Sequence, residues 1–197
     1  MPNMFGRSVL NLHRLSRRIG DRCFSLMIAG AFHSFGAHSV VVRPVRLAGE
    51  RRISIGSGVY IGAGCWLQTL EAGHVPCIVI GDQVEIAGQC VISSVLSVIV
   101  EEDVLLARNV YIADHSHRFV DTSVPIHLQG TDKIAPVVIK KGAWLGQNVV
   151  VCPGVTVGRN SVVGANSVVR KDVPDYCVAV GSPAVVIKDM TCAPRCK

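Results

Sequence analysis

Aliphatic side chains recur at every sixth position through the second half of the chain. Neither an α-helix, with its period of 3.6 residues, nor an alternating strand returns the same face every six residues. The spacing instead predicts very short strands joined by tight corners. One aliphatic side chain would point inward from each strand: Ile139, Leu145, Val151, Val157, Val163 and Val169.

The other positions of each six-residue unit support this interpretation. The third residue after each aliphatic is of a type that tolerates a left-handed backbone and forms turns: Gly142, Asn148, Gly154, Asn160, Asn166 and Asp172. The fourth is small or β-branched: Ala143, Val149, Val155, Ser161, Ser167 and Val173. The same register occurs earlier, at Ile55, Ile61, Leu67, Ile80, Ile86, Ile92, Val100, Leu106 and Ile112. These fifteen units predict an all-β solenoid of about five turns, with insertions at 68–78 and 93–99.

Three segments lie outside the period: residues 1–52, an excursion at 113–136 and a tail at 189–197. We therefore expect an N-terminal segment, a solenoid domain at 53–188 that contains the excursion, and the tail. In the N-terminal segment, Val9, Leu12, Leu15 and Ile19 have helical spacing, and arginines lie among them. This pattern predicts either a helix that caps the open end of the solenoid or one that lies on an anionic membrane.

The composition fits stacked short strands and an anionic partner. Aromatic residues make up only 5% of the chain and hydrophobic residues 49%, so the apolar content is mostly aliphatic. The formal net charge of +6 favours nucleic acid, a membrane surface or phosphorylated small molecules. Nucleic acid fits least well, because the arginines gather mainly in the first 52 residues and few aromatics are available for base stacking.

The eight cysteines are scattered and include no CxxC pair. Such spacing is typical of buried thiols in a reducing compartment, not of a disulfide framework or a zinc site. The longest apolar run near the start, residues 23–32, is far shorter than the roughly 20 residues that span a bilayer. We therefore expect a cytoplasmic protein whose membrane contact, if it has one, is peripheral.

Residues 141–188, KGAWLGQNVVVCPGVTVGRNSVVGANSVVRKDVPDYCVAVGSPAVVIK, are similar to the hexapeptide-repeat acyltransferases almost without a gap. The resemblance covers the solenoid domain and is closest to the sugar and polysaccharide O-acetyltransferases of the galactoside and maltose acetyltransferase type. It implies a left-handed parallel β-helix that uses acetyl-CoA. It also implies a homotrimer with active sites in the grooves between subunits.

The excursion begins YIADHSHRFVDTSVPIHLQG, residues 111–130, and holds three of the seven histidines. In the family that the chain resembles, a catalytic histidine lies on the loop that interrupts the solenoid, five residues beyond the last inward aliphatic before that loop. Counting from Ile112, that position is His117, which we expect to be the general base because histidine as a residue type has an unperturbed pKa near neutral pH. His115 is the alternative for this role, and His127 ranks behind both.

The resemblance also implies positions for the substrates. Three residues would bind the acceptor: Asp114, Ser93 and Ser94. Asp114 would alternatively orient an imidazole. One coil before the histidine, where the sugar acetyltransferases carry an Asn and an Asp, this sequence departs from the family and offers residues 87–89 and the serines 93 and 94. Four residues would meet the pantetheine arm or the thioester of the cofactor: Trp144, Gly146, Gln147 and Ala165. Gln147 stands where relatives often have Ser. Three cations would face the phosphates of CoA: Arg170, Lys171 and Lys188. No metal is expected.

The function implied is transfer of an acetyl group from acetyl-CoA to a hydroxyl of a sugar or a surface-polysaccharide precursor. An amino-sugar N-acetyltransferase is an alternative, because the same base would serve an amine. A γ-class carbonic anhydrase shares the solenoid but needs three histidines around zinc, and the two histidines of the excursion are only two apart, with His74 on an insertion. A non-catalytic binding module is a further alternative.

Overall fold

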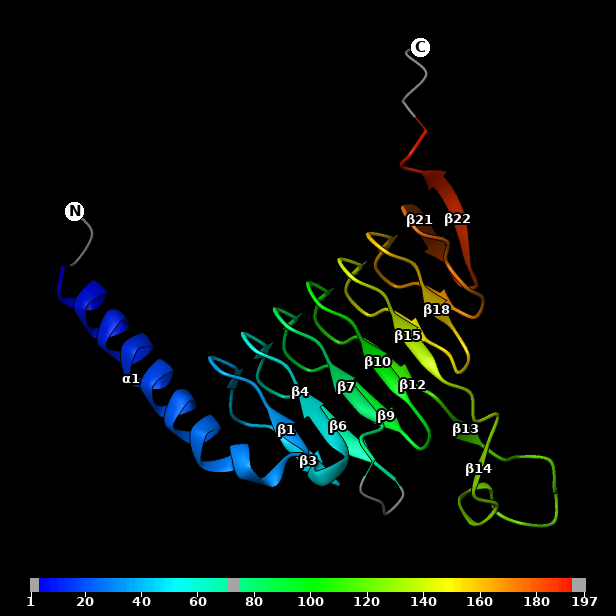
Figure 1. Cartoon of the computed structure of the whole chain (residues 1–197), viewed down its shortest axis with the longest axis horizontal. Helices are drawn as coiled ribbons and strands as arrows, with labels where there is room; N and C mark the ends of the chain where they lie inside the picture. Colours follow the sequence, from blue (N-terminus) through cyan, green and yellow to red (C-terminus); the bar gives the residue numbers. More distant parts are fainter. Residues whose placement is uncertain (1–3, 71–74, 193–197) are drawn as a thin grey trace.

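The computed structural model describes residues 4–70 and 75–192, which form a three-sided parallel β-helix preceded by a long helix (Figure 1). The first sheet consists of β1 (Ser34–Phe35), β4 (Ile53–Ile55), β7 (Ile78–Ile80), β10 (Val98–Val100), β15 (Val137–Ile139) and β18 (Thr156–Val157). The second contains β2 (Val40–Val41), β5 (Tyr60–Ile61), β8 (Glu85–Ile86), β11 (Leu105–Leu106), β16 (Trp144–Leu145), β19 (Val162–Val163), β21 (Cys177–Gly181) and β22 (Ala184–Asp189). The third contains β3 (Arg46–Ala48), β6 (Trp66–Thr69), β9 (Val91–Ser94), β12 (Tyr111–Ala113), β17 (Val150–Val151) and β20 (Val168–Val169).

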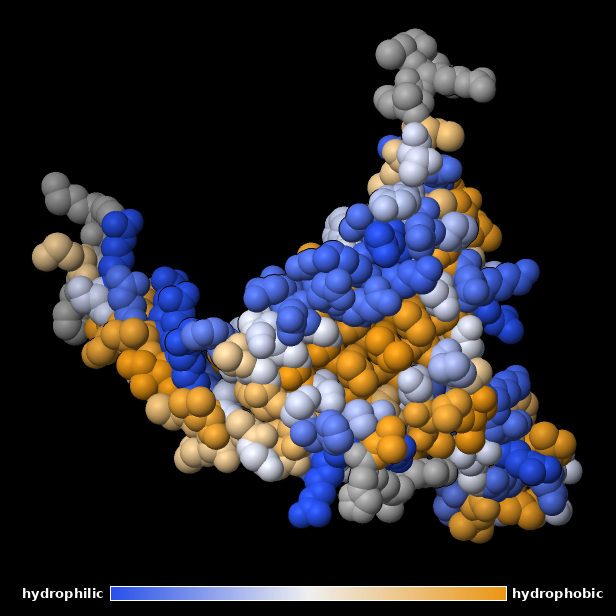
Figure 2. All heavy atoms as spheres, viewed as in Figure 1, coloured by the Kyte–Doolittle hydropathy of each residue, from blue (hydrophilic) through white to orange (hydrophobic). Residues whose placement is uncertain are grey.

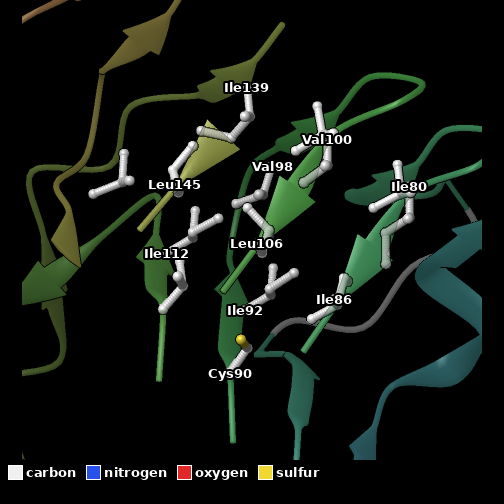
Figure 3. Packing of buried hydrophobic residues seen from close by; sticks show 14 of the residues in the cluster. Ile80, Ile86, Cys90, Ile92, Val98, Val100, Leu106, Ile112, Ile139 and Leu145 are labelled. Atoms are coloured by element: carbon white, nitrogen blue, oxygen red, sulfur yellow. The ribbon is translucent and has the colours of Figure 1, made fainter. Parts of the chain in front are cut away.

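The core is a stack of the predicted inward aliphatic side chains. On the second sheet, Leu106 pairs in register with Ile86 on one side and Leu145 on the other. All fifteen predicted inward positions are at most 2% exposed. Figure 3 shows several of them converging on the axis of the prism. The six-residue period is therefore confirmed, because each short strand contributes one side chain to a continuous aliphatic column.

The corners also follow the pattern, with one exception. Five of the six predicted turn residues after Ile139 have positive φ angles, for example Asn148 at 60°. Asn148 also links neighbouring turns: its Nδ2 donates to Asn166 Oδ1 at 2.8 Å, and its Oδ1 accepts from Asn109 Nδ2 at 3.1 Å. Asp172 is the exception, since it is absent from the positive-φ corners and accepts a hydrogen bond from the Thr156 N–H at 2.7 Å instead.

The solenoid begins earlier than the sequence pattern indicates. Strands β1, β2 and β3, which all precede residue 53, pair in parallel with β4, β5 and β6. The described chain therefore has six complete turns instead of about five from Ile53 onward. The sequence pattern does not reveal the first turn for two reasons. Its inward positions are Phe35, Val41 and Leu47, so that an aromatic replaces the first aliphatic, and Pro44 occupies one of its corners.

Helix α1 (Met4–Ile28) is attached to the solenoid only by its C-terminal part, and it diverges from the sheets toward its N-terminus (Figure 1). Buried Ser25 accepts a hydrogen bond from the Val41 N–H at 2.9 Å through its Oγ. Buried Asp21 lies 3.3 Å from Arg43 Nε. In the described residues, no helix is both long enough and apolar enough to span a bilayer.

Two short helices flank the first turn, η1 (Ala29–Ala31) and η2 (Glu50–Arg52), and β22 closes the other end of the second sheet. Strand β22 turns back antiparallel to β21 and ends at Asp189. The solenoid therefore ends close to the expected boundary at residue 188, and residues 193–197 of the expected tail lie outside the described part of the chain.

Candidate active site

The excursion leaves the solenoid after β12, at the corner between the third and first sheets. Its two ends are held together by the antiparallel pair β13 (Ser116–His117) and β14 (Thr131–Asp132). The Ala135 N–H also donates to the Asp114 carbonyl at 2.8 Å. The tip contains the single-turn helix η3 (Ile126–Leu128). The first residues of the excursion are thus fixed to the rigid stack, which is what a catalytic group requires.

Asp114 is completely buried at this corner and is surrounded by hydrogen-bond donors. Its Oδ2 accepts from Ser94 Oγ and from the N–H groups of Leu96 and Ser97, each at 2.7 Å. Its Oδ1 accepts from the Val95 N–H at 2.9 Å. These donors belong to the insertion at 93–99, one turn below in the stack. The insertion therefore forms a backbone cradle for a carboxylate, a role that its sequence does not signal.

The cradle keeps Asp114 ionised. Burial by itself raises the pKa of this carboxyl. The hydrogen bonds from the Val95 N–H, His115, Ser94 and the Leu96 N–H outweigh burial, so that the pKa of Asp114 is lowered from its ordinary value. A negative charge is therefore held beside the histidine.

His115 is the histidine that this charge orients. Its Nδ1 lies 2.8 Å from Asp114 Oδ1, and the residue is 9% exposed. Because the ionised carboxylate can only accept, Nδ1 carries the proton in the neutral ring, and Nε2 is left with a lone pair. A buried, oriented imidazole with Nε2 unprotonated is suited to remove a proton from a substrate hydroxyl.

The other two histidines of the excursion lack such a setting. His117 is exposed on β13, where its backbone pairs with Thr131, and His127 is exposed on η3. The structure therefore favours His115 over His117, in contrast to the preference from counting. Counting five residues beyond Ile112 leads to exposed His117, because the chain bends inward directly after Ala113 and buries Asp114 and His115 first.

The expected acceptor-binding residues need correction. Asp114 and Ser94 are both 0% exposed, and Ser93 is 2% exposed. Ser94 Oγ donates to Asp114, and Ser93 Oγ accepts from Gln68 Nε2 at 2.8 Å. None of the three can meet an acceptor hydroxyl directly, because their polar atoms are used inside the stack. Of the two roles expected for Asp114, the structure supports the orientation of an imidazole.

The expected cofactor residues lie elsewhere on the prism. Trp144 projects from β16 on the second sheet and is 48% exposed. Gly146 and exposed Ala165 are stacked at the following corner, where a Cβ on Gly146 would lie 2.7 Å from the Ala165 backbone nitrogen. The Gly146 N–H donates to the Val163 carbonyl at 2.8 Å, so it cannot serve the thioester oxygen as expected. Gln147 is exposed at this corner.

The expected phosphate-binding cations are only partly brought together. Arg170 and Lys171 line a surface cavity of about 310 Å³ with residues 183–185 at the end of the solenoid. Lys188 lies on β22 opposite Val178 and is not among the lining residues of that cavity. Two of the three cations could therefore act on one anionic group, while the third lies apart.

Within one chain, the histidine and the tryptophan do not share a site. His115 follows the third sheet, whereas Trp144 lies on the second sheet in the next turn. These are different sides of a filled prism. If both act on one reaction, the two halves must come from neighbouring subunits, as in the grooves that the resemblance implies.

The described residues do not form the histidine cluster that a zinc site needs. Within residues 4–70 and 75–192, no three side chains of His, Cys, Asp or Glu lie close enough to hold a metal ion. His74, the third histidine that the carbonic anhydrase alternative would use, lies outside the described residues.

Comparison with known proteins identifies the family. The family described as "Bacterial transferase hexapeptide (six repeats)" matches residues 136–171. The putative lipopolysaccharide biosynthesis O-acetyl transferase WbbJ of Escherichia coli is 35% identical over 151 residues, which cover 74% of this chain and 76% of WbbJ. The chain belongs to the hexapeptide acetyltransferase family. Both the predicted resemblance and the left-handed parallel β-helix are thereby confirmed.

Two further members of the family are informative. A probable acetyltransferase of Mycobacterium tuberculosis, Rv3034c, is 39% identical over 138 residues, which are 70% of this chain but only 44% of that protein. A solved structure of a galactoside acetyltransferase in complex with coenzyme A superposes with a TM-score of 0.58 at 27% identity, covering 84% of this chain and 69% of that one. This chain thus spans less than half of the mycobacterial relative and most of WbbJ.

Proposed function

We propose that the protein transfers an acetyl group from acetyl-CoA to a hydroxyl of a sugar or of a surface-polysaccharide precursor. The observation that carries this proposal is the contact between His115 and the cradled carboxylate of Asp114. Family membership supports it, since WbbJ is described as a lipopolysaccharide O-acetyl transferase and a galactoside acetyltransferase has been solved with coenzyme A.

In the proposed reaction, His115 Nε2 takes the proton of the acceptor hydroxyl as the oxygen attacks the thioester carbonyl carbon. A C–O bond forms, the tetrahedral intermediate collapses and the C–S bond breaks. The proton passes from His115 to the leaving thiolate of CoA. Asp114 holds the ring in the productive tautomer and stabilises the imidazolium that forms between the two transfers.

The donor side of the site is proposed to come from a neighbouring subunit of a homotrimer. Trp144, half-exposed on the second sheet, would pack beside the pantetheine arm, and Gln147 and Ala165 would line the channel. Arg170 and Lys171 would face phosphate groups of CoA, since their cavity is lined by cations and small apolar residues. A cytoplasmic location is proposed because acetyl-CoA would be supplied there.

The test is acetyl-CoA-dependent thiol release with a panel of sugar acceptors, together with binding of CoA by calorimetry. His115→Ala should lower kcat by about 10²–10⁴-fold and leave CoA binding intact. The matched variant His117→Ala should lower kcat by less than about tenfold. Trp144→Ala should weaken CoA binding. If His117→Ala, and not His115→Ala, abolishes turnover, the assignment of the base is wrong.

The acceptor panel also separates the alternatives. It contains sugars with free hydroxyls and matched amino sugars, because an imidazole base would serve either group. Acetylation of the amine alone would replace O-acetylation by N-acetylation at the same site. Turnover that depends on stoichiometric zinc would overturn the transferase proposal.

A further inference from the structure

Helix α1 carries a continuous apolar face that has no partner in the described parts of the chain. Its side chains are 50–77% exposed and recur at three-, four- and seven-residue intervals along one side of the helix: Val9, Leu12, Leu15, Ile19 and Leu26. We call these five residues the outer face. The helix has 25 residues and is therefore about 37 Å long. Single exposed leucines are common on protein surfaces, but a contiguous apolar stripe of this length is typical of an interaction site.

The attachment of the helix prevents the outer face from folding back onto the solenoid. The contacts with the first turn are made by Asp21 and Ser25, which are buried, and by Phe24 and Ile28, which pack partly against the core. These four residues lie on the side of the helix opposite to the outer face. Figure 2 shows hydrophobic residues along the outer edge of the helix and hydrophilic residues toward the β-helix.

The helix is also strongly basic. It contains five arginines and a single acidic residue, Asp21, so its formal charge is +4. Arg18 and Arg22 each follow an outer-face residue by three positions, Leu15 and Ile19 respectively, and so they border the outer face along one edge. Arg14, Arg17, Arg18 and Arg22 all line the cleft between the helix and the solenoid, so Arg18 and Arg22 lie between this cleft and the outer face. All of these arginines are exposed.

We propose that α1 is a peripheral anchor that lies in the surface of an anionic lipid bilayer. The outer face enters the boundary between headgroups and acyl chains, and Arg18 and Arg22 reach the lipid phosphates at its edge. Anionic bilayer surfaces bind an apolar stripe bordered by cations, because burial of the stripe adds to the attraction between the cations and the lipid phosphates. The helix does not cross the bilayer, because no described helix is long and apolar enough.

A second copy of the helix is a poorer occupant of the outer face. Two copies would bring together two helices of charge +4, and the one acidic residue is already paired with Arg43. The repulsion would oppose the gain from apolar burial, whereas an anionic surface adds attraction to that gain. Charge complementarity therefore decides between lipid and self-association.

The test is co-sedimentation of the full chain with vesicles of phosphatidylcholine alone and of phosphatidylcholine mixed with phosphatidylglycerol. Point substitutions are used because truncation beyond residue 33 would remove strands of the first turn. Wild type should sediment with the anionic vesicles, with much weaker binding to the neutral ones and at high salt. Leu12→Glu should lower the partition coefficient at least about tenfold, and Arg18→Gln about fivefold.

Val75→Glu is the matched control for Leu12→Glu, because it also replaces a largely exposed aliphatic by a carboxylate, but at a position outside α1. It should bind vesicles like wild type. The proposal is overturned if wild type does not sediment with anionic vesicles, or if Leu12→Glu and Val75→Glu bind equally. It is also overturned if Leu12→Glu changes the oligomeric state in lipid-free ultracentrifugation, since the outer face would then be an interface between copies.

Discussion

Replacing Asp114 by Asn tests the central feature of the candidate site. The carboxylate receives five donors: Ser94 Oγ, His115 Nδ1 and three backbone N–H groups. A carboxamide has a single acceptor oxygen. Its best position is that of Oδ2, where three donors converge at 2.7 Å. The amide NH₂ then faces His115 Nδ1 and the Val95 N–H.

Both stability and activity should fall. The retained hydrogen bonds lose their charge assistance and one buried donor is left poorly satisfied, which together cost about 3–5 kcal/mol of the free energy of unfolding. Because the amide donates to Nδ1, the imidazole must carry its proton on Nε2, where it cannot act as a base. We therefore expect kcat to fall by about 10³-fold even where the variant is folded.

The effect on stability should depend on pH. The pKa of Asp114 in the folded state lies below its ordinary value of about 3.9, so its stabilising contribution is present above that pH and is lost as the pH falls through the folded-state pKa. The free energy of unfolding in urea should therefore differ most between wild type and Asp114→Asn near pH 7, and this difference should shrink below about pH 4.

The control is Asp82→Asn, an exposed aspartate whose Oδ1 accepts from the Ser57 N–H at 2.7 Å. It should cost less than about 1 kcal/mol and leave kcat unchanged. The reasoning would be refuted if Asp114→Asn matched Asp82→Asn in both measurements, or if its destabilisation were the same at every pH.

Two further predictions concern the solenoid itself. Leu106 is completely buried, so Leu106→Ala should lower the free energy of unfolding by about 2–5 kcal/mol. Leu105 lies on the outer side of the same strand, so Leu105→Ala should lower it by under about 1 kcal/mol. Equal urea midpoints for the two variants would contradict the inward register. Asn148→Ala should cost about 2–3 kcal/mol through its left-handed backbone and two side-chain hydrogen bonds. Asn148→Gly should be milder because it keeps the backbone conformation, and a glycine variant less stable than the alanine variant would argue against corner strain.

The six-residue period was enough to predict the core, as Leu106 and Leu145 illustrate. Each strand is so short that only one side chain can point inward, so the same chemical type must recur at the same spacing. The first turn escaped prediction because Phe35 replaces an aliphatic and the Arg43–Pro44 corner departs from the Gly or Asn pattern. Its place in the sheets depends on pairing with β4, β5 and β6, which no local signal records.

The candidate site was only half predictable. Counting along the chain located the excursion and its histidines, and chemistry restricted the base to that residue type. It could not choose between His115 and His117, which are two residues apart. The choice depends on Asp114, and the burial of Asp114 depends on donors from residues 94–97, one turn lower in the stack. The eight-residue step between Ile92 and Val100 was the available signal for that insertion.

The sequence alone therefore determined the solenoid, because a repeated inward aliphatic and a turn-forming corner are local requirements of every strand. The tertiary structure decided which histidine is oriented, because the carboxylate and its donors meet only when one turn stacks on another. It also decided that the apolar face of α1 points away from the sheets. That direction depends on Asp21 and Ser25 reaching the first turn, a contact between segments that the helical spacing cannot specify.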